Sequence, residues 1–186
     1  FDSISFISEG IRKKITVNKN IPTYILPLGA DIISDRNKKF NSLKILYIGA
    51  LYNRNILDTV IGVKKFIDLH PDIDITYSIV GDGEELLKIK EYISQYKLNN
   101  KVKTYGKIPY NKLKIFLDNH NLGVSYIPII DCFQYQPPTK TFEYGLSGLY
   151  VVATKTYANE LVINKSNGIL INDNPDDFSN ALYYIY

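Results

Sequence analysis

The sequence predicts an α/β fold, a Rossmann-like parallel sheet of about six strands with helices on both faces. From residue 43 onward, short apolar runs alternate with longer segments whose apolar side chains recur at helical spacing. The apolar runs are nearly continuous, which is typical of parallel strands buried on both faces. Because ligands of such sheets collect beyond the carboxyl ends of the strands, the candidate functional residues are those that follow a strand.

Before residue 43 the pattern differs. Residues 3–8 alternate polar and apolar side chains and predict a strand, residues 8–15 predict a short helix, and residues 23–26 predict a second strand. Residues 32–42 are polar and rich in lysine, as a linker is. The chain thus divides into an N-terminal part of residues 1–22, a linker of residues 23–42 and the Rossmann-like domain of residues 43–186.

Within the domain, the elements follow from periodicity and from end signals. Pro109 opens a helix, and Asn174 before Pro175 is an N-cap followed by proline at the first helical position. Glu84 and Glu85 stand in the first turn of a helix, where carboxylates suit the helix dipole. The predicted strands are residues 43–49, 75–80, 102–106, 123–128, 149–153 and 168–171. The predicted helices are residues 56–69, 84–96, a segment from 109, 139–146 and a segment from 175 to the C-terminus.

Composition argues against several classes of function. The net charge is +3, and no segment combines dense Lys/Arg with stacking aromatics, so nucleic acid is not an expected partner. Cys132 is the only cysteine, which excludes an internal disulfide and a cysteine-based metal site and fits a reducing cytoplasm. His70 and His120 each stand at the end of a predicted helix, far from other metal-ligand types. No apolar run approaches the ~18 residues of a transmembrane segment.

Gly49 ends the first strand of the domain, and the loop after it offers one arginine, Arg54. A glycine there lets phosphates approach the backbone, and a guanidinium can clamp a diphosphate with two hydrogen bonds. The alternative is an ordinary strand–helix turn with a surface arginine. The chain lacks G-x-G-x-x-G and G-x-x-x-x-G-K-[ST] at this place, which argues against a dinucleotide oxidoreductase and a P-loop NTPase. The Gly-Asp-Gly sequence at residues 81–83 by itself predicts only a tight turn.

Residues 138–154 carry the most specific pattern. Here a helix begins with Thr139 as its expected cap, and Lys140 and Glu143 lie three residues apart on one face near its N-terminus. The free N–H groups of such a first turn attract phosphate, and Lys140 adds a positive charge. Glu143 can accept hydrogen bonds from two adjacent hydroxyls, as on a ribose. The alternative is a salt bridge between the two side chains on an ordinary surface helix.

Together these segments resemble the retaining glycosyltransferases of group one, which have the GT-B fold. The family pattern Pro-x-Lys-x-x-Glu-Tyr, a small-residue stretch and Gly-x-Pro-Val-Val-Ala-Thr is similar to residues 138–154. Other segments resemble the family in the same order, namely residues 25–31, 46–51, 79–84, 102–109, Glu160 and residues 167–171.

The resemblance implies the C-terminal, donor-binding half of an enzyme that transfers a hexose from a donor such as UDP- or GDP-hexose with retention, and without a cofactor or metal. It implies that Glu143 holds the donor ribose, that the backbone at Lys107 and Ile108 contacts the base, and that Gly49 lies under the diphosphate. The implied donor-nucleotide residues are Gly49, Ala50, Gly81, Lys107, Ile108, Thr139 and Glu143. The candidate catalytic residues are Arg54 and Lys140.

The sequence departs from the family pattern at several positions. Ala50 and Ile56 stand where the family often has Arg and Lys, and Arg54 is the candidate replacement. The first glutamate of the family's glutamate pair falls at Tyr135, and Asp131 is the nearest carboxylate. Whether Asp131 or Tyr135 contacts the donor sugar is left open by the pattern.

The family also implies a larger protein. Residues 1–22 correspond to a remnant of an N-terminal acceptor domain, so a glycan or lipid-linked acceptor would bind through the missing part, and this fragment would bind donor without transferring sugar. The family and its nucleotide-sugar supply imply a cytoplasmic protein, peripheral at the inner membrane face. The high content of Lys, Ile, Asn and Tyr favours a bacterial source. The family resemblance implies a role in polysaccharide biosynthesis. The alternatives are a non-catalytic sugar-nucleotide-binding module and a sugar-nucleotide epimerase of the same fold.

Overall fold

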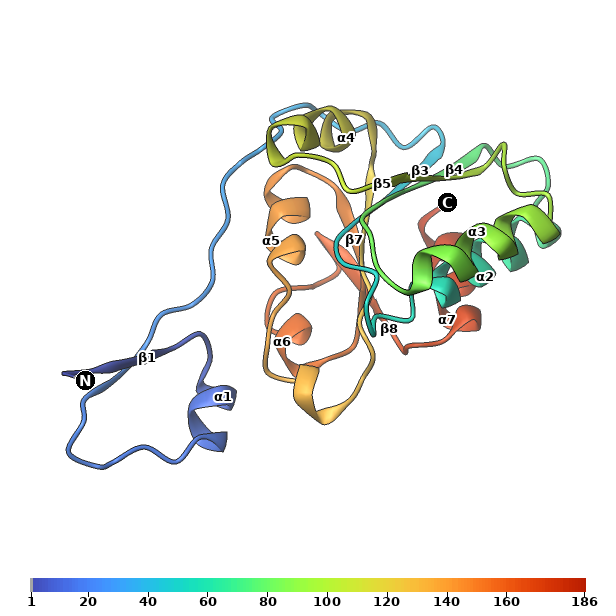
Figure 1. The fold of residues 1–186 in the computed structure, drawn as a ribbon. Coiled ribbons are helices and arrows are strands. Elements are labelled where there is room, and N and C mark those ends of the chain that lie inside the picture. Colours follow the sequence, from blue (N-terminus) through green and yellow to red (C-terminus); the bar gives the residue numbers. More distant parts are fainter. Residues whose placement is uncertain (1) are drawn as a thin grey trace.

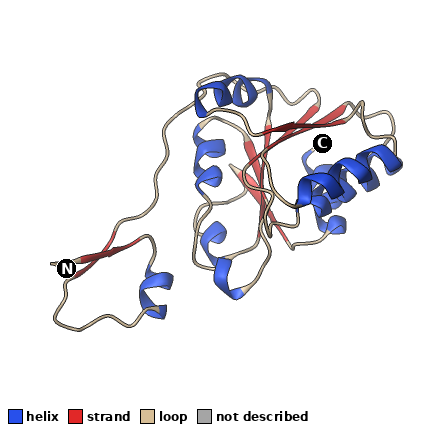
Figure 2. Ribbon diagram, in the orientation of Figure 1, coloured by secondary structure: helices blue, strands red, loops and turns tan. Residues whose placement is uncertain are grey.

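The computed structural model describes residues 2–186, so Phe1 of the predicted N-terminal part lies outside the described residues. The domain is built on a six-stranded sheet in the order β5-β4-β3-β6-β7-β8, and every neighbouring pair is parallel (Figure 2). Its strands are β3 (Leu43–Ile48), β4 (Ile75–Val80), β5 (Val102–Gly106), β6 (Leu122–Ser125), β7 (Tyr150–Thr154) and β8 (Gly168–Ile171). The predicted α/β fold with a six-stranded parallel sheet is confirmed.

Helices cover both faces of this sheet (Figure 1). One face carries α2 (Ile56–Leu69), α3 (Glu85–Gln95) and α7 (Pro175–Ile185), and the other carries α4 (Leu113–Asn119), α5 (Thr139–Leu146) and α6 (Tyr157–Glu160). The apolar side chains form two clusters, one under each helical layer. The near-continuous apolar strands are thus explained, because successive side chains of one strand enter opposite clusters: Ile45 and Tyr47 enter one, and Leu46 enters the other.

Large buried side chains with polar tips are hydrogen-bonded inside this core. The Tyr47 hydroxyl donates to the Ala50 carbonyl oxygen at 2.6 Å, and the hydroxyls of Thr59 and Tyr77 lie 2.9 Å apart. The Tyr144 hydroxyl accepts from the Ile48 N–H at 2.7 Å. Because an unpaired buried hydroxyl is costly, these bonds fix the end of β3 relative to α5 and to the loop that follows β3.

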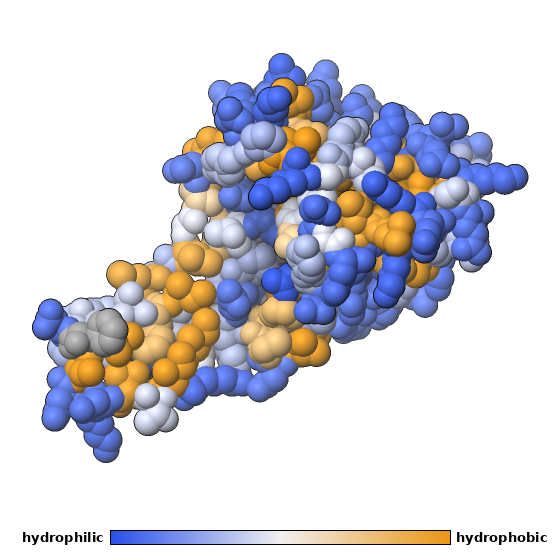
Figure 3. Space-filling view, in the orientation of Figure 1, coloured by the Kyte–Doolittle hydropathy of each residue, from blue (hydrophilic) through white to orange (hydrophobic). Residues whose placement is uncertain are grey.

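The N-terminal part forms a small separate sheet. Strands β1 (Ile4–Phe6) and β2 (Thr23–Ile25) pair in parallel, and α1 (Glu9–Lys14) lies in the connection between them. An extended segment joins this part to the domain (Figure 1). Figure 3 shows apolar residues gathered over the N-terminal part, and Tyr24 and Leu26 are exposed there.

The linker runs along the domain from residue 34 onward. The Ser34 hydroxyl donates to the Asp118 carboxylate at 2.6 Å, and the side-chain amide of Asn121 donates to the carbonyl oxygens of Lys39 and Ser42. These bonds attach the linker to the C-terminal end of α4 and to the start of β6. The approach of the chain to β3 is therefore fixed over its last residues.

Several element bounds differ from the predicted ones for identifiable reasons. Strand β6 ends at Ser125, not at residue 128, because the Ile127 N–H donates to the side-chain hydroxyl of Thr154 and not to a backbone carbonyl oxygen of β7. Helix α6 was not predicted, since four residues are too few to show a helical period. The expectation that Thr139 caps α5 is wrong: Thr139 is the first helical residue, and Pro138 holds the N-cap position without a side-chain hydrogen bond.

The strand order places the functional region. From β3 the chain proceeds outward through β4 to β5, and from β6 it proceeds outward in the other direction through β7 to β8. The carboxyl ends of β3 and β6 therefore flank the point where the strand order reverses, which is where open α/β sheets bind ligands. The loop after β3 and the loop between β6 and α5 meet there.

Candidate functional site

An open cavity of about 580 Å³ lies at this reversal point. The loop after β3, the loop between β6 and α5, and the first turns of α5 form most of its wall. Ile7 of the N-terminal part and Leu28, which follows β2, complete the wall, so the cavity lies between these two residues and the domain. Six of the predicted site residues line it together: Gly49, Ala50, Arg54, Thr139, Lys140 and Glu143.

Three predicted donor-nucleotide residues do not line the cavity. Gly81 lies behind the loop after β3, where an added Cβ would overlap the Gly49 carbonyl oxygen. Lys107 is exposed beyond the end of β5. Ile108 packs against the core cluster under α4 and α5, next to Leu113, which does line the cavity.

Lys140 extends from α5 toward the end of β3. Its Nζ lies 4.0 Å from the centroid of the Tyr47 ring, and a Cβ added at Gly49 would overlap Nζ, so a side chain at position 49 would force this ammonium to shift. Burial, together with the nearby Arg54 guanidinium, lowers the pKa of Lys140 to about 7, although Glu143 acts in the opposite direction. Among the described residues, none forms an ion pair or hydrogen bond with this ammonium.

Glu143 is the second partly buried charge on α5. Burial raises the pKa of its carboxyl, and the Lys140 charge opposes that rise. Within residues 2–186 no salt bridge joins Glu143 to Lys140, so the salt-bridge interpretation of their spacing is not supported. Glu143 lines the cavity, and its carboxylate oxygens remain acceptors for a ligand.

Arg54 brings a second cation to the cavity from the loop after β3. Its guanidinium lies 4.4 Å from the centroid of the Phe133 ring, which is a cation–π distance. Phe133 belongs to the short 3-10 helix η2 (Asp131–Phe133) in the loop between β6 and α5. Arg54 therefore joins the two loops of the reversal point and presents a permanent charge near Lys140.

The start of α5 adds N–H donors to these cations. Pro138 at the N-cap makes no side-chain hydrogen bond, and the first backbone bond that closes onto it comes from the Thr141 N–H at 3.0 Å. The N–H groups of Thr139 and Lys140 precede that bond and point out of the helix end. Two cations and a helix N-terminus thus line one cavity together with Gly49, an arrangement suited to an anion.

A sequence profile described as "Glycosyl transferases group 1" matches residues 42–186. The chain belongs to this family. An uncharacterized glycosyltransferase of Methanocaldococcus jannaschii is 25% identical over an alignment of 202 residues, gaps included, which covers 97% of this chain and 48% of that protein. The chain therefore spans about half the length of this curated relative.

Solved glycosyltransferases share the fold. A Staphylococcus aureus TarM variant in complex with fondaparinux, α-GlcNAc-glycerol and UDP superposes with a TM-score of 0.74 at 19% identity, over 99% of this chain and 36% of that one. Anabaena HepE in complex with UDP and glucose gives 0.72 at 16% identity, over 96% of this chain and 52% of that one. The group 1 domain described here therefore has the GT-B architecture.

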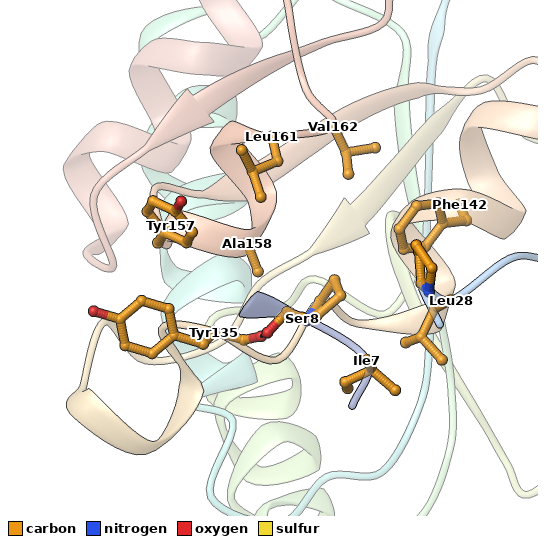
Figure 4. A pocket seen from close by; sticks show the side chains of 11 residues that line it. Ile7, Ser8, Leu28, Tyr135, Phe142, Tyr157, Ala158, Leu161 and Val162 are labelled. Atoms are coloured by element: carbon orange, nitrogen blue, oxygen red, sulfur yellow. Dashed lines mark hydrogen bonds between the residues drawn. The ribbon is translucent and has the colours of Figure 1, made fainter. Parts of the chain in front are cut away.

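In this group 1 glycosyltransferase, neither Asp131 nor Tyr135 lines the cavity. Asp131 pairs with Lys14 at 2.7 Å, and the Tyr135 carbonyl oxygen accepts from the Ser8 hydroxyl at 2.8 Å. The Tyr135 ring lies beside Tyr157 at the edge of an adjacent apolar pocket of about 180 Å³ (Figure 4). The loop between β6 and α5 is therefore held toward the N-terminal part at these two positions.

Sequence reasoning missed three polar or aromatic residues of the cavity wall. Phe133 and Gln136 come from the loop between β6 and α5, and Tyr110 comes from the 3-10 helix η1 (Tyr110–Lys112) that precedes α4. Their only sequence signal is their position after a strand, since no motif in the family pattern includes them. The contact between Phe133 and Arg54 depends on two loops that are distant in sequence.

Proposed function

We propose that this chain is the donor-binding half of a retaining hexosyltransferase and that its cavity binds a nucleoside diphosphate sugar. The observation that carries the proposal is that Arg54, Lys140 and the N-terminus of α5 line one cavity, with Lys140 next to Gly49. A diphosphate is the part of such a donor that needs two cations and free N–H donors. UDP is the first donor nucleotide to test, because TarM and HepE were both solved with UDP.

The remaining walls suit the other parts of the donor. Glu143 lies one helical turn beyond Lys140, so its carboxylate can accept from the two ribose hydroxyls while Lys140 contacts phosphate. Tyr110 and Leu113 offer a flat and an apolar surface for the base, close to Ile108. The hexose would then lie toward Phe133 and Gln136 on the opposite wall.

In the proposed reaction, departure of the nucleoside diphosphate places negative charge on the β-phosphate. Arg54, Lys140 and the N–H groups of α5 are fixed where this charge develops, so they stabilise the transition state more than the bound donor. Removing one such donor group typically costs ~3 kcal/mol in the barrier. The proposal includes no metal and no cofactor, as the family resemblance implies.

Transfer itself is assigned to the longer protein. The acceptor, a glycan or a lipid-linked saccharide, would enter from the N-terminal side of the cavity, where this chain contributes only Ile7 and Leu28. The exposed apolar residues over the N-terminal part would be covered by the rest of an acceptor domain (Figure 3). We expect this chain alone to bind donor and to transfer no sugar.

Along residues 2–186, no helix has the length and apolar character needed to cross a membrane. A cytoplasmic place at the inner membrane face remains part of the proposal.

Calorimetric titration with UDP, GDP and ADP tests the donor site. One nucleotide should bind, and Glu143→Ala should lose about 1–3 kcal/mol of binding free energy, as for a lost hydrogen bond to a charged group. Glu91→Ala on the exposed side of α3 removes an equal charge away from the cavity and should leave the affinity unchanged. Binding that is indifferent to Glu143, or no binding of any of the three, would contradict the proposal.

One rival function has a specific observation in its favour. Ala50 and Tyr135 replace residues with which the family often contacts the donor, which fits a non-catalytic sugar-nucleotide-binding module. Full-length protein that binds the nucleotide sugar but neither transfers nor hydrolyses it would support that rival. An epimerase of the same fold would favour a histidine in the cavity. It is less well supported, since His70 and His120 lie at the C-terminal ends of α2 and α4 and do not line the cavity.

A further inference from the structure

The N-terminus of α2 is capped by a side chain from another helix. Asn55 holds the N-cap position in a left-handed conformation, with φ of 54°, and its side chain makes no capping bond. The Glu85 carboxylate, from the first turn of α3, instead accepts from the N–H groups of Arg54 at 2.8 Å, Asn55 at 3.0 Å and Ile56 at 2.6 Å. One carboxylate thus satisfies three consecutive backbone donors.

The backbone of Glu85 holds the other end of the same loop. Its N–H donates to the Leu51 carbonyl oxygen at 3.1 Å, and the Leu51 N–H donates to the Asp82 carbonyl oxygen at 2.9 Å. Glu85 therefore contacts the loop after β3 both where it leaves the strand and where it enters α2. Arg54 belongs to the second of these attachments through its own N–H.

The Gly-Asp-Gly turn before Glu85 explains how α3 comes this close. Gly83 has φ of +153°, and a Cβ added there would lie 2.5 Å from the carbonyl carbon of Leu51. Gly81 has φ of +152° and a comparable overlap with Gly49. Both glycines are thus required for backbone-to-backbone packing against the loop after β3, and this turn supports the cavity wall from behind.

The capping arrangement also decides which helix end faces the diphosphate. The N–H of Ile56, the first residue of α2, and the N–H groups of Arg54 and Asn55 before it are already bonded to Glu85, and a carboxylate there repels a second anion. The N–H groups at the start of α5 are bonded to no side chain. An anion is therefore expected to bind at the N-terminus of α5 and not at that of α2. The Arg54 side chain lies over Phe133 and lines the cavity.

We propose that Glu85 is a positioning residue, which holds the loop after β3 so that Arg54 reaches the donor diphosphate at the N-terminus of α5. This inference rests on the proposed function of the cavity. It assigns a role to the glutamate and to the Gly-Asp-Gly turn, neither of which contacts the cavity.

The experiment compares the wild-type chain with Glu85→Ala, Glu85→Gln and the neighbouring control Glu84→Gln, whose side chain caps nothing. The ligands are whichever of UDP, GDP and ADP the wild type binds, and the matching nucleoside without phosphates. Hydrogen exchange of the amides of residues 54–56 is measured on the free proteins. In Glu85→Ala this protection should be lost, and diphosphate affinity should fall about tenfold, as for a lost cap that fixes a binding loop. Nucleoside affinity should stay unchanged.

Two further variants separate positioning from simple stabilisation. Glu85→Gln keeps one acceptor oxygen for the Arg54 and Asn55 N–H groups, so its loss of affinity should be only about threefold. In the Arg54→Ala background, Glu85→Ala should cause no further loss of diphosphate affinity, because it acts through Arg54.

Each outcome decides between the two proposals. Two results would overturn the role of Glu85 and leave the proposed function standing. One is a wild-type chain that binds nucleotide and a Glu85→Ala variant with the same affinity. The other is an equal loss of diphosphate affinity from Glu85→Ala in the wild-type and Arg54→Ala backgrounds. Retained amide protection in Glu85→Ala would overturn it as well. A wild-type chain that binds none of the three nucleotides would overturn the proposed function, and this inference with it.

Discussion

The ammonium group of Lys140 is placed where its charged form is disfavoured. It lies over Tyr47 and beside Gly49, and burial and the Arg54 charge lower its pKa to about 7. A phosphate at this point would reverse the balance, since an anion in contact with the ammonium favours the charged form. The side chain is thus only partly charged near neutral pH until an anion binds.

The first prediction concerns stability. The folded chain releases the Lys140 proton near pH 7, whereas the unfolded chain holds it to about pH 10.5, so the unfolded state binds more protons between these values. The free energy of unfolding should therefore gain a rising contribution from Lys140 across that window, and Lys140→Met should remove it. Urea unfolding at several pH values measures the slope. Lys88→Met, on the exposed side of α3, is the control and should leave the slope unchanged.

The second prediction concerns the ligand. Because a bound diphosphate raises the pKa of Lys140, binding at pH 8 to 9 should take up as much as about one proton from the buffer. Calorimetry in two buffers with different ionisation enthalpies gives this number directly. Lys140→Met should bind more weakly and take up no proton. Equal uptake in the wild type and the variant would show that another group titrates.

At the scale of the element, two helical glycines allow the effect of side-chain packing to be distinguished from that of intrinsic helix propensity. Gly62 lies where α2 meets α7, and a Cβ there would come within 2.8 Å of the Pro175 carbonyl oxygen and 3.0 Å of Phe178. Gly145 lies on the exposed side of α5, where an added Cβ would meet nothing within 4 Å. The same substitution should therefore have opposite effects at the two positions.

We predict that Gly145→Ala stabilises the chain by about 0.5–1 kcal/mol through helix propensity. Gly62→Ala gains the same propensity but overpacks the contact between α2 and α7, which typically costs about 1–3 kcal/mol, so its net effect should be destabilising. Chemical denaturation of both variants measures the difference. Stabilisation by Gly62→Ala would show that α7 can move away at little cost.

The elements themselves were largely predictable from the sequence. The bounds of α2, β4, β5, α5 and β8 agree with the predicted ones, because each combines a clear apolar period with a local start or stop signal. The role of Glu85 was not predictable. Its place in the first turn of α3 predicted a favourable interaction of its carboxylate with the dipole of that helix. In the structure the carboxylate accepts from N–H groups at the N-terminus of α2. No local pattern records a cap supplied by another helix.

The candidate site shows the same limit. Gly49, Lys140 and Glu143 line one cavity, and their positions follow from strand ends and helical spacing. Phe133, Asp131 and the other contacts of the loop between β6 and α5 depend on which distant segment that loop packs against. Such contacts arise at the scale of the whole molecule.

At that scale, α1 of the N-terminal part contacts the loop between β6 and α5 of the domain. Gly10 of α1 lies against Tyr135, so closely that an added Cβ would overlap the ring. Around it are the bond from the Ser8 hydroxyl to the Tyr135 carbonyl oxygen at 2.8 Å and the ion pair of Lys14 with Asp131 at 2.7 Å. Glycine at position 10 is what lets α1 approach closely enough for both.

The last prediction tests this contact as the attachment between the two parts. Gly10→Val must displace either α1 or Tyr135, so the two polar contacts should be lost and the N-terminal part should move away from the domain. Small-angle scattering should show a larger radius of gyration and a longer maximum dimension than in the wild type. Gly29→Val is the matched control, because an added Cβ at that linker position meets nothing within 4 Å, and its scattering should equal that of the wild type. An unchanged profile for Gly10→Val would mean that other contacts, such as those of Ile7 and Leu28 at the cavity wall, hold the two parts together.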